Sequence, residues 1–167
     1  FFVQDKTSAY LLKSIGFTNH TISGDSRFDS VLTTTNNPES FPLIEQFGKS
    51  KPIIICGSTW GKDELLLSQF IKENPHYNYI IAPHEMHHIS HLQKQTGAQL
   101  FSTSNTENIN SNNVLIIDSI GILSSIYQYA NIAYIGGGFG SGIHNILEAV
   151  TFGLPVVFGP NYQKFIE

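Results

Sequence analysis

The chain has 167 residues, of which 41% are hydrophobic, and it carries a formal net charge of -4. These values fit one globular domain with a buried core and exclude a disordered chain. Lysine and arginine do not cluster, so we expect no nucleic acid partner. No apolar run approaches the roughly 18 to 20 residues of a membrane-spanning helix, and no signal peptide is recognisable, so we expect a soluble fragment. Cys56 is the only cysteine, which excludes an internal disulfide.

The two ends of the sequence suggest a piece of a longer protein. It opens with Phe1 instead of an initiator methionine, and it stops at Glu167, where a helix is expected to begin after Gly159-Pro160. Residues 1–24 predict a short strand at 1–4, a helix at 7–15 and a strand at 20–23. This segment is interpreted as the end of a preceding domain, as a linker, or as the first unit of the domain formed by residues 25–167.

Short apolar runs recur along the rest of the chain, and several end in glycine, proline, serine or asparagine, where a loop to a helix would begin. Such runs are typical of strands that are buried on both faces of a parallel sheet. The clearest predicted strands are 52–56, 77–82, 114–117, 131–135 and 155–158.

Predicted helices lie between these strands, at 62–73, 85–96, 121–130 and 144–152. The apolar residues Leu65, Leu66, Phe70 and Ile71 are expected to form the buried face of the first helix. Two polar segments, 33–40 and 105–113, are predicted to be surface loops. The alternation of strands and helices predicts an α/β fold, a Rossmann-like parallel sheet flanked by helices. Right-handed crossovers then gather the loops after the strands at one edge, where ligands bind.

The segment Ile135–Glu148 (IGGGFGSGIHNILE) predicts a strand that runs into a glycine-rich turn and then into a helix. Gly137 and Gly138 would let backbone amides approach a phosphate, and the helix start would add unpaired donors. Asn145 and Glu148 are three residues apart and would take ribose hydroxyls from one helix face. The alternative is a turn made only for tight packing. The glycines do not follow the dinucleotide-binding spacing, so we do not expect NAD.

The segment Gly57–Asp63 resembles a Walker A loop, but it is one residue too short between its glycines and has Asp63 where serine or threonine must bind magnesium. A P-loop is therefore rejected. Ser58 and Thr59 remain candidates for phosphate contacts across the edge of the sheet. The alternative is that one of them only caps the following helix.

The segment His84–His88 (HEMHH) matches the zinc-protease pattern H-E-x-x-H, in which both histidines face the metal from one helix. Here Pro83 follows a strand directly, so His84 falls in the loop or at the helix start. We therefore expect no metal site. His87, His88 and His91 are interpreted as solvated positions, whereas His84 is placed at the ligand-binding edge.

A third loop at this edge is Asp118–Leu123 (DSIGIL). Backbone groups around Gly121 are candidates to bind a base, with Ile120 and Ile122 as apolar walls, and a helix start with an N-cap is the alternative. The acidic and basic residues of the segment GDSRFD, at 24–29, are interpreted as local ion pairs.

Taken in order, the motifs GDSRFD at 24–29, GSTW at 57–60, Pro83-His84, DSIG at 118–121 and GGG at 136–138 with HNILE at 144–148 resemble the 3-deoxy-D-manno-octulosonic acid (Kdo) transferases. The resemblance extends over the whole chain. It implies that residues 25–167 are the C-terminal, donor-binding domain of a GT-B glycosyltransferase and that residues 1–24 end the acceptor domain or link the two.

The resemblance also implies the activity of the intact enzyme. Kdo would pass from CMP-Kdo to the lipid A precursor of lipopolysaccharide, with inversion and without a metal at the nucleotide, at the cytoplasmic face of the bacterial inner membrane. The donor substrate CMP-Kdo is expected in place of a cofactor. The general base, the lipid A contacts and the membrane contacts would lie in the N-terminal half, so this fragment is expected to bind CMP without catalysing transfer.

Residue by residue, the resemblance implies that CMP is bound by three short stretches of this sequence. Many members of the family have arginine at the position of His84 and an acidic residue at that of Ile122, so weaker contacts are expected there. Three alternatives remain, namely a UDP-sugar transferase or UDP-N-acetylglucosamine 2-epimerase relative, a zinc hydrolase using His84 and His88, and a scaffold without ligand. The implied CMP-binding residues are Pro83 and His84, Ile120, Gly121 and Ile122, and Asn145, Ile146, Leu147 and Glu148.

Overall fold

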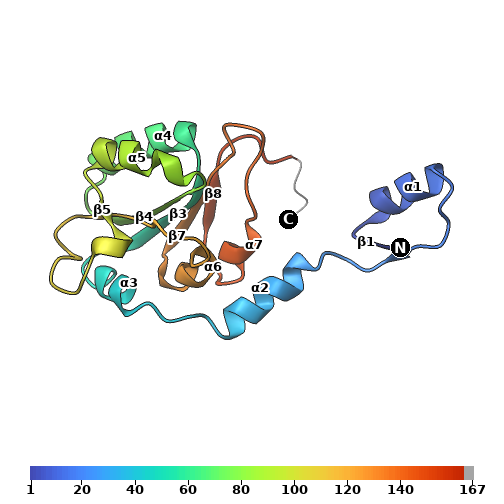
Figure 1. Cartoon of the computed structure of the whole chain (residues 1–167), viewed down its shortest axis with the longest axis horizontal. Helices are drawn as coiled ribbons and strands as arrows, with labels where there is room; N and C mark the ends of the chain where they lie inside the picture. Colours follow the sequence, from blue (N-terminus) through green and yellow to red (C-terminus); the bar gives the residue numbers. More distant parts are fainter. Residues whose placement is uncertain (164–167) are drawn as a thin grey trace.

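A computed structural model describes residues 1–163 of the chain, and the helix expected near Phe165 lies outside these residues. Six parallel strands form the main sheet in the order β5-β6-β4-β3-β7-β8, which confirms the predicted parallel sheet (Figure 1). Five of them were predicted within two or three residues, and β5, only two residues long, was not. The strands are β3 (Ile53–Thr59), β4 (Asn78–Pro83), β5 (Gln99–Leu100), β6 (Val114–Ile116), β7 (Ile132–Ile135) and β8 (Val156–Phe158).

Helices cover both faces of this sheet. Figure 1 shows α4 and α5 on one side and α3, α6 and α7 on the other. The helices of this part are α2 (Arg27–Asn36), α3 (Pro42–Phe47), α4 (Gly61–Glu73), α5 (Ile89–Thr96), α6 (Leu123–Ile126) and α7 (Leu147–Val150). Within residues 1–163, three short 3-10 helices complete them, η1 (Met86–His88), η2 (Phe101–Thr103) and η3 (Tyr127–Tyr129).

Alternation along the strands builds two apolar cores. Ile53 and Ile55 of β3 pack against α3, α6 and α7, whereas Ile54 and Cys56 pack against α4 and α5. Successive side chains of a strand point to opposite faces, so a strand covered on both sides must be apolar throughout. Cys56 is fully buried, as expected of a small core residue. Its burial raises the pKa of its thiol.

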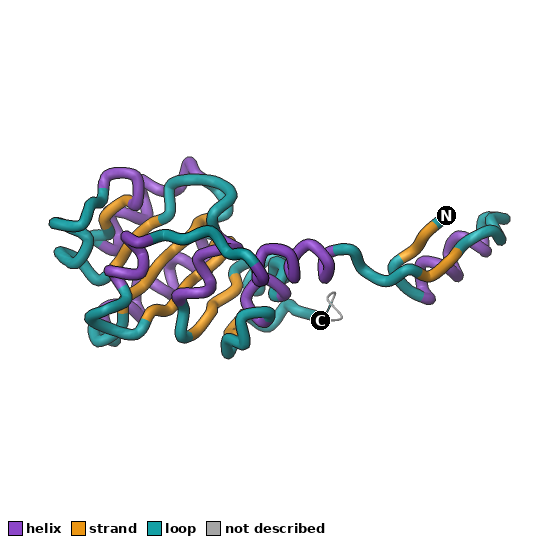
Figure 2. Tube along the Cα trace, turned by 90° about the horizontal axis from the view of Figure 1, so that it is seen from below, coloured by secondary structure: helices purple, strands orange, loops and turns teal. Residues whose placement is uncertain are grey.

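Residues 1–22 form a separate unit, which we call the N-terminal unit. It contains β1 (Phe2–Val3), α1 (Lys6–Ser14) and β2 (Thr21–Ile22), and its two strands pair in parallel outside the main sheet. Figures 1 and 2 both show it at a distance from the sheet, joined to it through α2. The elements predicted for residues 1–24 are therefore confirmed. Their assignment to an acceptor domain or a linker stays a prediction.

The loop predicted at 33–40 is wrong in its first part, because α2 continues to Asn36. The Thr33 and Thr35 hydroxyls donate to carbonyl oxygens four residues back, at 3.0 and 2.9 Å, so the helix itself satisfies these polar side chains. Val31 is buried in this helix, which packs against α6 and α7. The irregular segment predicted at 105–113 is confirmed.

Of the four residues predicted to form the buried face of α4, Ile71 is buried and the other three are not. Leu65, Leu66 and Phe70 are 65%, 50% and 42% exposed, and Leu67, which was not predicted, is buried beside Ile71. The first two carboxylates of α4, those of Asp63 and Glu64, point inward because they accept hydrogen bonds from Gly137 and Thr59. With this side of the helix turned inward, Leu65, Leu66 and Phe70 lie on the outer side. Leu66 and Phe70 line an apolar groove beside β7 and β8.

Candidate functional site

The candidate site lies at the carboxyl edge of the sheet, between β3 and β7. The chain passes from β3 to β4, builds β5 and β6 on that side, and then crosses back to β7 on the other side of β3. Where successive loops part in this way they leave a crevice, and open α/β sheets bind ligands there. Gly57 pairs with Ile135 near the ends of the two strands. The segments 58–62 and 136–146 therefore meet across this crevice.

Close packing requires glycine at several positions of the loop after β7, of which Gly136 and Gly138 touch other segments of the chain. A Cβ at Gly136 would lie 2.2 Å from the carbonyl oxygen of Ser58, and a Cβ at Gly138 would lie 2.6 Å from the Cα of Gly159. Both distances are below van der Waals contact, so larger residues would force the backbones apart. The packing interpretation is confirmed for these two positions, and a phosphate contact at Gly138 stays a prediction.

A buried carboxylate ties this loop to α4. Asp63 is 1% exposed, and its Oδ2 accepts hydrogen bonds from the amides of Trp60 and Gly137, both at 2.9 Å. Its Oδ1 accepts from the hydroxyl of Tyr134 at 2.6 Å. Burial, and next the hydrogen bond to Asp63, raise the pKa of Tyr134, so its hydroxyl keeps the donated proton. The Gly137 amide thus already donates to Asp63, and the role of Gly137 in phosphate binding stays a prediction.

Ser58 and Thr59 differ in what they offer. Ser58 has a φ of 52°, in the left-handed region, where the pairing of β3 with β4 is irregular. Thr59 is 1% exposed, and its hydroxyl donates to Glu64 Oε1 at 3.2 Å. The Thr59 side chain is therefore buried and engaged with Glu64, and a phosphate contact by Ser58, Thr59 or their amides stays a prediction. Neither residue caps α4, since Trp60 is the N-cap and Asp63 binds its amide.

Three aromatic side chains from three loops meet at the crevice. The ring centroid of Trp60 lies 4.4 Å from that of His84 and 6.1 Å from that of His144, in stacked geometry. Trp60 Nε1 donates to His144 Nε2 at 2.8 Å, which holds the proton of the neutral imidazole on Nδ1. Burial, and next the charge of His84, lower the pKa of His144. His144 is thus held neutral, with one N–H donor at Nδ1.

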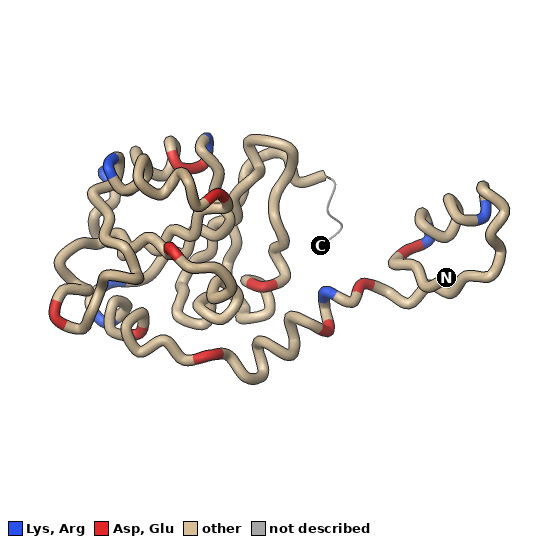
Figure 3. Tube along the Cα trace, viewed as in Figure 1, with Lys and Arg blue, Asp and Glu red and all other residues tan. Residues whose placement is uncertain are grey.

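A cavity of about 500 Å³ opens between the start of α4 and the loop after β7. It is lined by residues 60–63, Gly137 and residues 139–141. The first turn of a 13-residue helix such as α4 has unpaired amides and a partial positive charge. Lys62 contributes a positive charge to this cavity. Its Nζ donates to the carbonyl of Phe139, another lining residue, at 3.4 Å. Lysine and arginine are otherwise spread along the chain (Figure 3). The start of α4 and the Lys62 ammonium group therefore lie at the same cavity.

The predicted CMP-binding residues near β4 and β6 lie at the same edge. Pro83 ends β4 and is buried, and the exposed His84 donates its amide to the Thr59 carbonyl at 2.9 Å. Ile120 is 87% exposed, an unusual state for a large apolar side chain in a loop. Gly121 has a φ of 97°, which favours glycine. Ile122, the N-cap of α6, packs against the core, so its role as an apolar wall stays a prediction.

The helix predicted from His144 begins only at Leu147 and has four residues. Asn145 lies before it, and its Oδ1 accepts from the Leu147 amide at 3.1 Å. The prediction that Asn145 and Glu148 share a helix face is wrong, because this local hydrogen bond starts the helix later. Leu147 is buried and Ile146 packs against the core.

Glu148 lines a small cavity next to α2, and burial raises the pKa of its carboxyl. That cavity is separate from the one at Lys62. The structure thus brings together Ser58, His84 and the loop after β7, and it does not bring Glu148 beside Lys62.

Four residues at this edge were missed as functional candidates, namely Trp60, Lys62, Asp63 and His144. Lys62 and Asp63 were considered only as parts of a P-loop and set aside with it. The H-N-x-L-E segment did mark His144, but its partner Trp60 lies 84 positions away, and no spacing signal links the two.

Comparisons with known proteins give a consistent result. No protein-family model matches the chain. In an alignment of 170 residues that covers 97% of the chain, it is 29% identical to the 3-deoxy-D-manno-octulosonic acid transferase of Rickettsia bellii (strain RML369-C). It is 33% identical over 116 residues, 66% of the chain, to the enzyme of the same name from Aquifex aeolicus (strain VF5). The chain covers only 40% and 33% of the length of these two relatives.

A solved structure shows the same fold. It is the C-terminal CMP-Kdo binding domain of WaaA from Acinetobacter baumannii, which matches with a TM-score of 0.62 at 19% identity. The match covers 83% of this chain and 72% of that one. The predicted fold, a Rossmann-like sheet as in the C-terminal domain of a GT-B glycosyltransferase, is therefore confirmed.

Proposed function

Because this chain is a homologue of the Kdo transferases, we propose that it is the part of such an enzyme that binds the sugar donor CMP-Kdo. The observation that carries the proposal is the crevice between β3 and β7, where a helix start, a glycine-rich loop and Lys62 line one cavity. The intact enzyme would transfer Kdo to the lipid A precursor at the cytoplasmic face of the inner membrane. Acceptor and membrane contacts are assigned to the part of the enzyme outside this chain.

The phosphate of CMP is placed in the cavity at the start of α4. Charge grows on this phosphate as the glycosidic bond breaks, and donors that are already oriented stabilise it without reorganisation. The amides of the first turn of α4 and the Lys62 ammonium supply such stabilisation, so no metal is needed at the nucleotide. We assign less weight to α7, because its four residues make only one turn.

The cytidine is placed along the edge towards β4 and β6. Ile120 offers an exposed apolar side chain, and the backbone around Gly121 offers hydrogen-bonding groups to a base. His84 lies between this loop and the phosphate cavity, stacked on Trp60. We propose that His84 takes the place that arginine holds in many relatives, as a smaller donor to the nucleotide. Glu148 keeps its assignment to the ribose, and binding would have to open the small cavity that it lines.

A calorimetric titration of the whole chain with CMP, UMP and UDP tests the proposal. We expect CMP to bind most tightly, and we expect Lys62→Ala to weaken CMP binding because it removes a cation from the phosphate cavity. Lys94→Ala, a substitution at the distant end of α5, is the matched control and is expected to leave CMP binding unchanged. A preference for UDP would replace the proposal by that of a UDP-sugar enzyme, and binding of none of the three would contradict it.

A further inference from the structure

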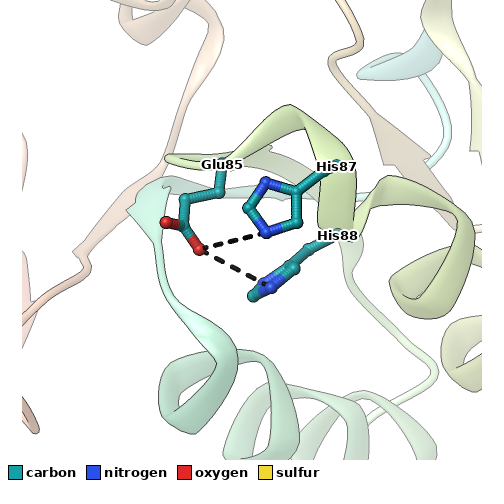
Figure 4. Close-up of side chains that lie close together, drawn as sticks. All are labelled: Glu85, His87 and His88. Atoms are coloured by element: carbon teal, nitrogen blue, oxygen red, sulfur yellow. Dashed lines mark ion pairs between the residues drawn. The ribbon is translucent and has the colours of Figure 1, made fainter.

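A second cluster of side chains lies outside the nucleotide crevice, in the turn between β4 and α5. Figure 4 shows the carboxylate of Glu85 facing the rings of His87 and His88. The Nε2 atoms of the two histidines lie 3.7 and 3.6 Å from the same oxygen, Oε2 of Glu85. Hydrogen bonds of this type measure about 2.7 to 3.2 Å, so these atoms converge without bonding one another directly.

The separations suit three ligands of one metal ion. Zinc bonds nitrogen at about 2.0–2.1 Å and carboxylate oxygen at about 2.0–2.2 Å, and tetrahedral angles then put two ligands roughly 3.4 Å apart. One ligand atom from each of the three residues lies within 4.8 Å of the others. Two imidazoles and one carboxylate are a donor set that zinc binds in proteins.

The backbone holds this arrangement in place. The amide of His88 donates to the carbonyl of Glu85 at 3.1 Å, which closes the turn, and α5 follows at once with Leu92 fully buried. The rings of His87 and His88 meet edge to face, 4.3 Å apart, and both remain accessible to solvent. A cation bound by these side chains would therefore keep an open position for a water molecule.

We propose that Glu85, His87 and His88 bind a divalent transition-metal ion such as Zn²⁺, with solvent in the fourth position. This set differs from the H-E-x-x-H pair considered in the sequence. His84 is turned away from it, since its ring stacks on Trp60 at the nucleotide crevice. The site is independent of the proposed function, and it does not require a metal at the nucleotide.

Calorimetric titration of the whole chain with Zn²⁺ alone, without nucleotide, tests the proposal. We expect saturable binding of one ion, and we expect His87→Ala and His88→Ala each to weaken it at least about tenfold, because each removes a ligand. Cobalt(II) should show the visible absorption of tetrahedral coordination in the unaltered chain and lose it in both variants. Circular dichroism checks that these exposed substitutions leave the fold intact.

The matched control is His91→Ala, which removes a histidine from the next turn of α5. Unchanged zinc affinity in this variant supports the proposal, whereas loss of binding indicates unspecific capture by a histidine-rich segment and overturns it. His84→Ala separates the proposed set from the pair His84 and His88, and a loss of zinc binding in that variant also overturns the proposal. Absence of saturable binding in the unaltered chain does the same, whatever the result with CMP.

Discussion

Replacing Asp63 tests whether one buried carboxylate organises the crevice. It joins three elements, since it accepts hydrogen bonds from Trp60 at the start of α4, from Gly137 in the glycine loop and from Tyr134 in β7. Hydrogen bonds to a charged group contribute about 1.5–3 kcal/mol each, and removing the acceptor leaves buried donors unpaired. Relief of the cost of burying the charge offsets part of this loss. We therefore expect Asp63→Ala to lower the free energy of unfolding by about 3–5 kcal/mol.

Urea unfolding of the variant and of the unaltered chain measures this difference. Asp63→Asn keeps an oxygen acceptor and should lose about 1–3 kcal/mol, and Tyr134→Phe removes one hydrogen bond and should lose about 1 kcal/mol. In a double-mutant cycle the losses of Asp63→Asn and Tyr134→Phe should not add, because the two residues share a bond. A loss below about 1 kcal/mol for Asp63→Ala, or additive losses in the cycle, would refute the reasoning.

Three further predictions concern the orientation of α4 and the titration of two half-buried groups. Leu67→Ala should cost about 2–4 kcal/mol in urea unfolding and Leu65→Ala less than about 0.5 kcal/mol, and equal losses would contradict the buried face seen here. Burial raises the pKa of Glu148 above 4.5, so the folded state holds its proton more tightly and stability falls as pH rises from 4.5 through the raised pKa. Glu148→Gln should remove this decrease in the free energy of unfolding and should weaken CMP binding. An unchanged pH dependence of the free energy of unfolding in the variant would contradict the prediction. Burial lowers the pKa of His144 below 6.5, so its contribution to stability is lost as pH falls from 6.5 through the lowered pKa. Trp60→Phe should raise this pKa in an NMR titration, because it removes the donor to the neutral ring, and an unchanged pKa would show that the hydrogen bond does not matter.

The strands could be predicted because burial on both faces leaves a continuous apolar run. The run from Ile53 to Cys56 shows this most clearly, since its side chains enter both cores in alternation. Parallel pairing then places the ends of β3 and β7 at one edge, so the meeting of their loops followed from the sequence. The two-residue strand β5 left no such pattern, because Gln99 and Leu100 are too few to show a period.

The buried faces of the helices were harder to predict than the strands. The sequence gives the type of each polar side chain but does not show its hydrogen-bond partner in the fold. Carboxylates usually lie at the surface, yet Asp63 and Glu64 are both buried. Asp63 binds the Gly137 amide in the loop after β7, and Glu64 binds the Thr59 hydroxyl. Their partners are fixed by the tertiary fold, in the case of Gly137 across 74 positions of the chain. For the same reason the edge was predicted as a binding site while the detailed roles of Thr59 and Gly137 were not.

An NMR titration of the isotope-labelled chain with CMP tests the central claim most directly. We expect the amide signals of residues 58–62 and of the loop after β7 to shift together and to saturate, because the phosphate would settle against both. The signals around Gly121 should follow with the base, whereas those of the N-terminal unit should stay in place. Saturable shifts confined to another face of the sheet, or no shifts at high CMP concentration, would contradict the account.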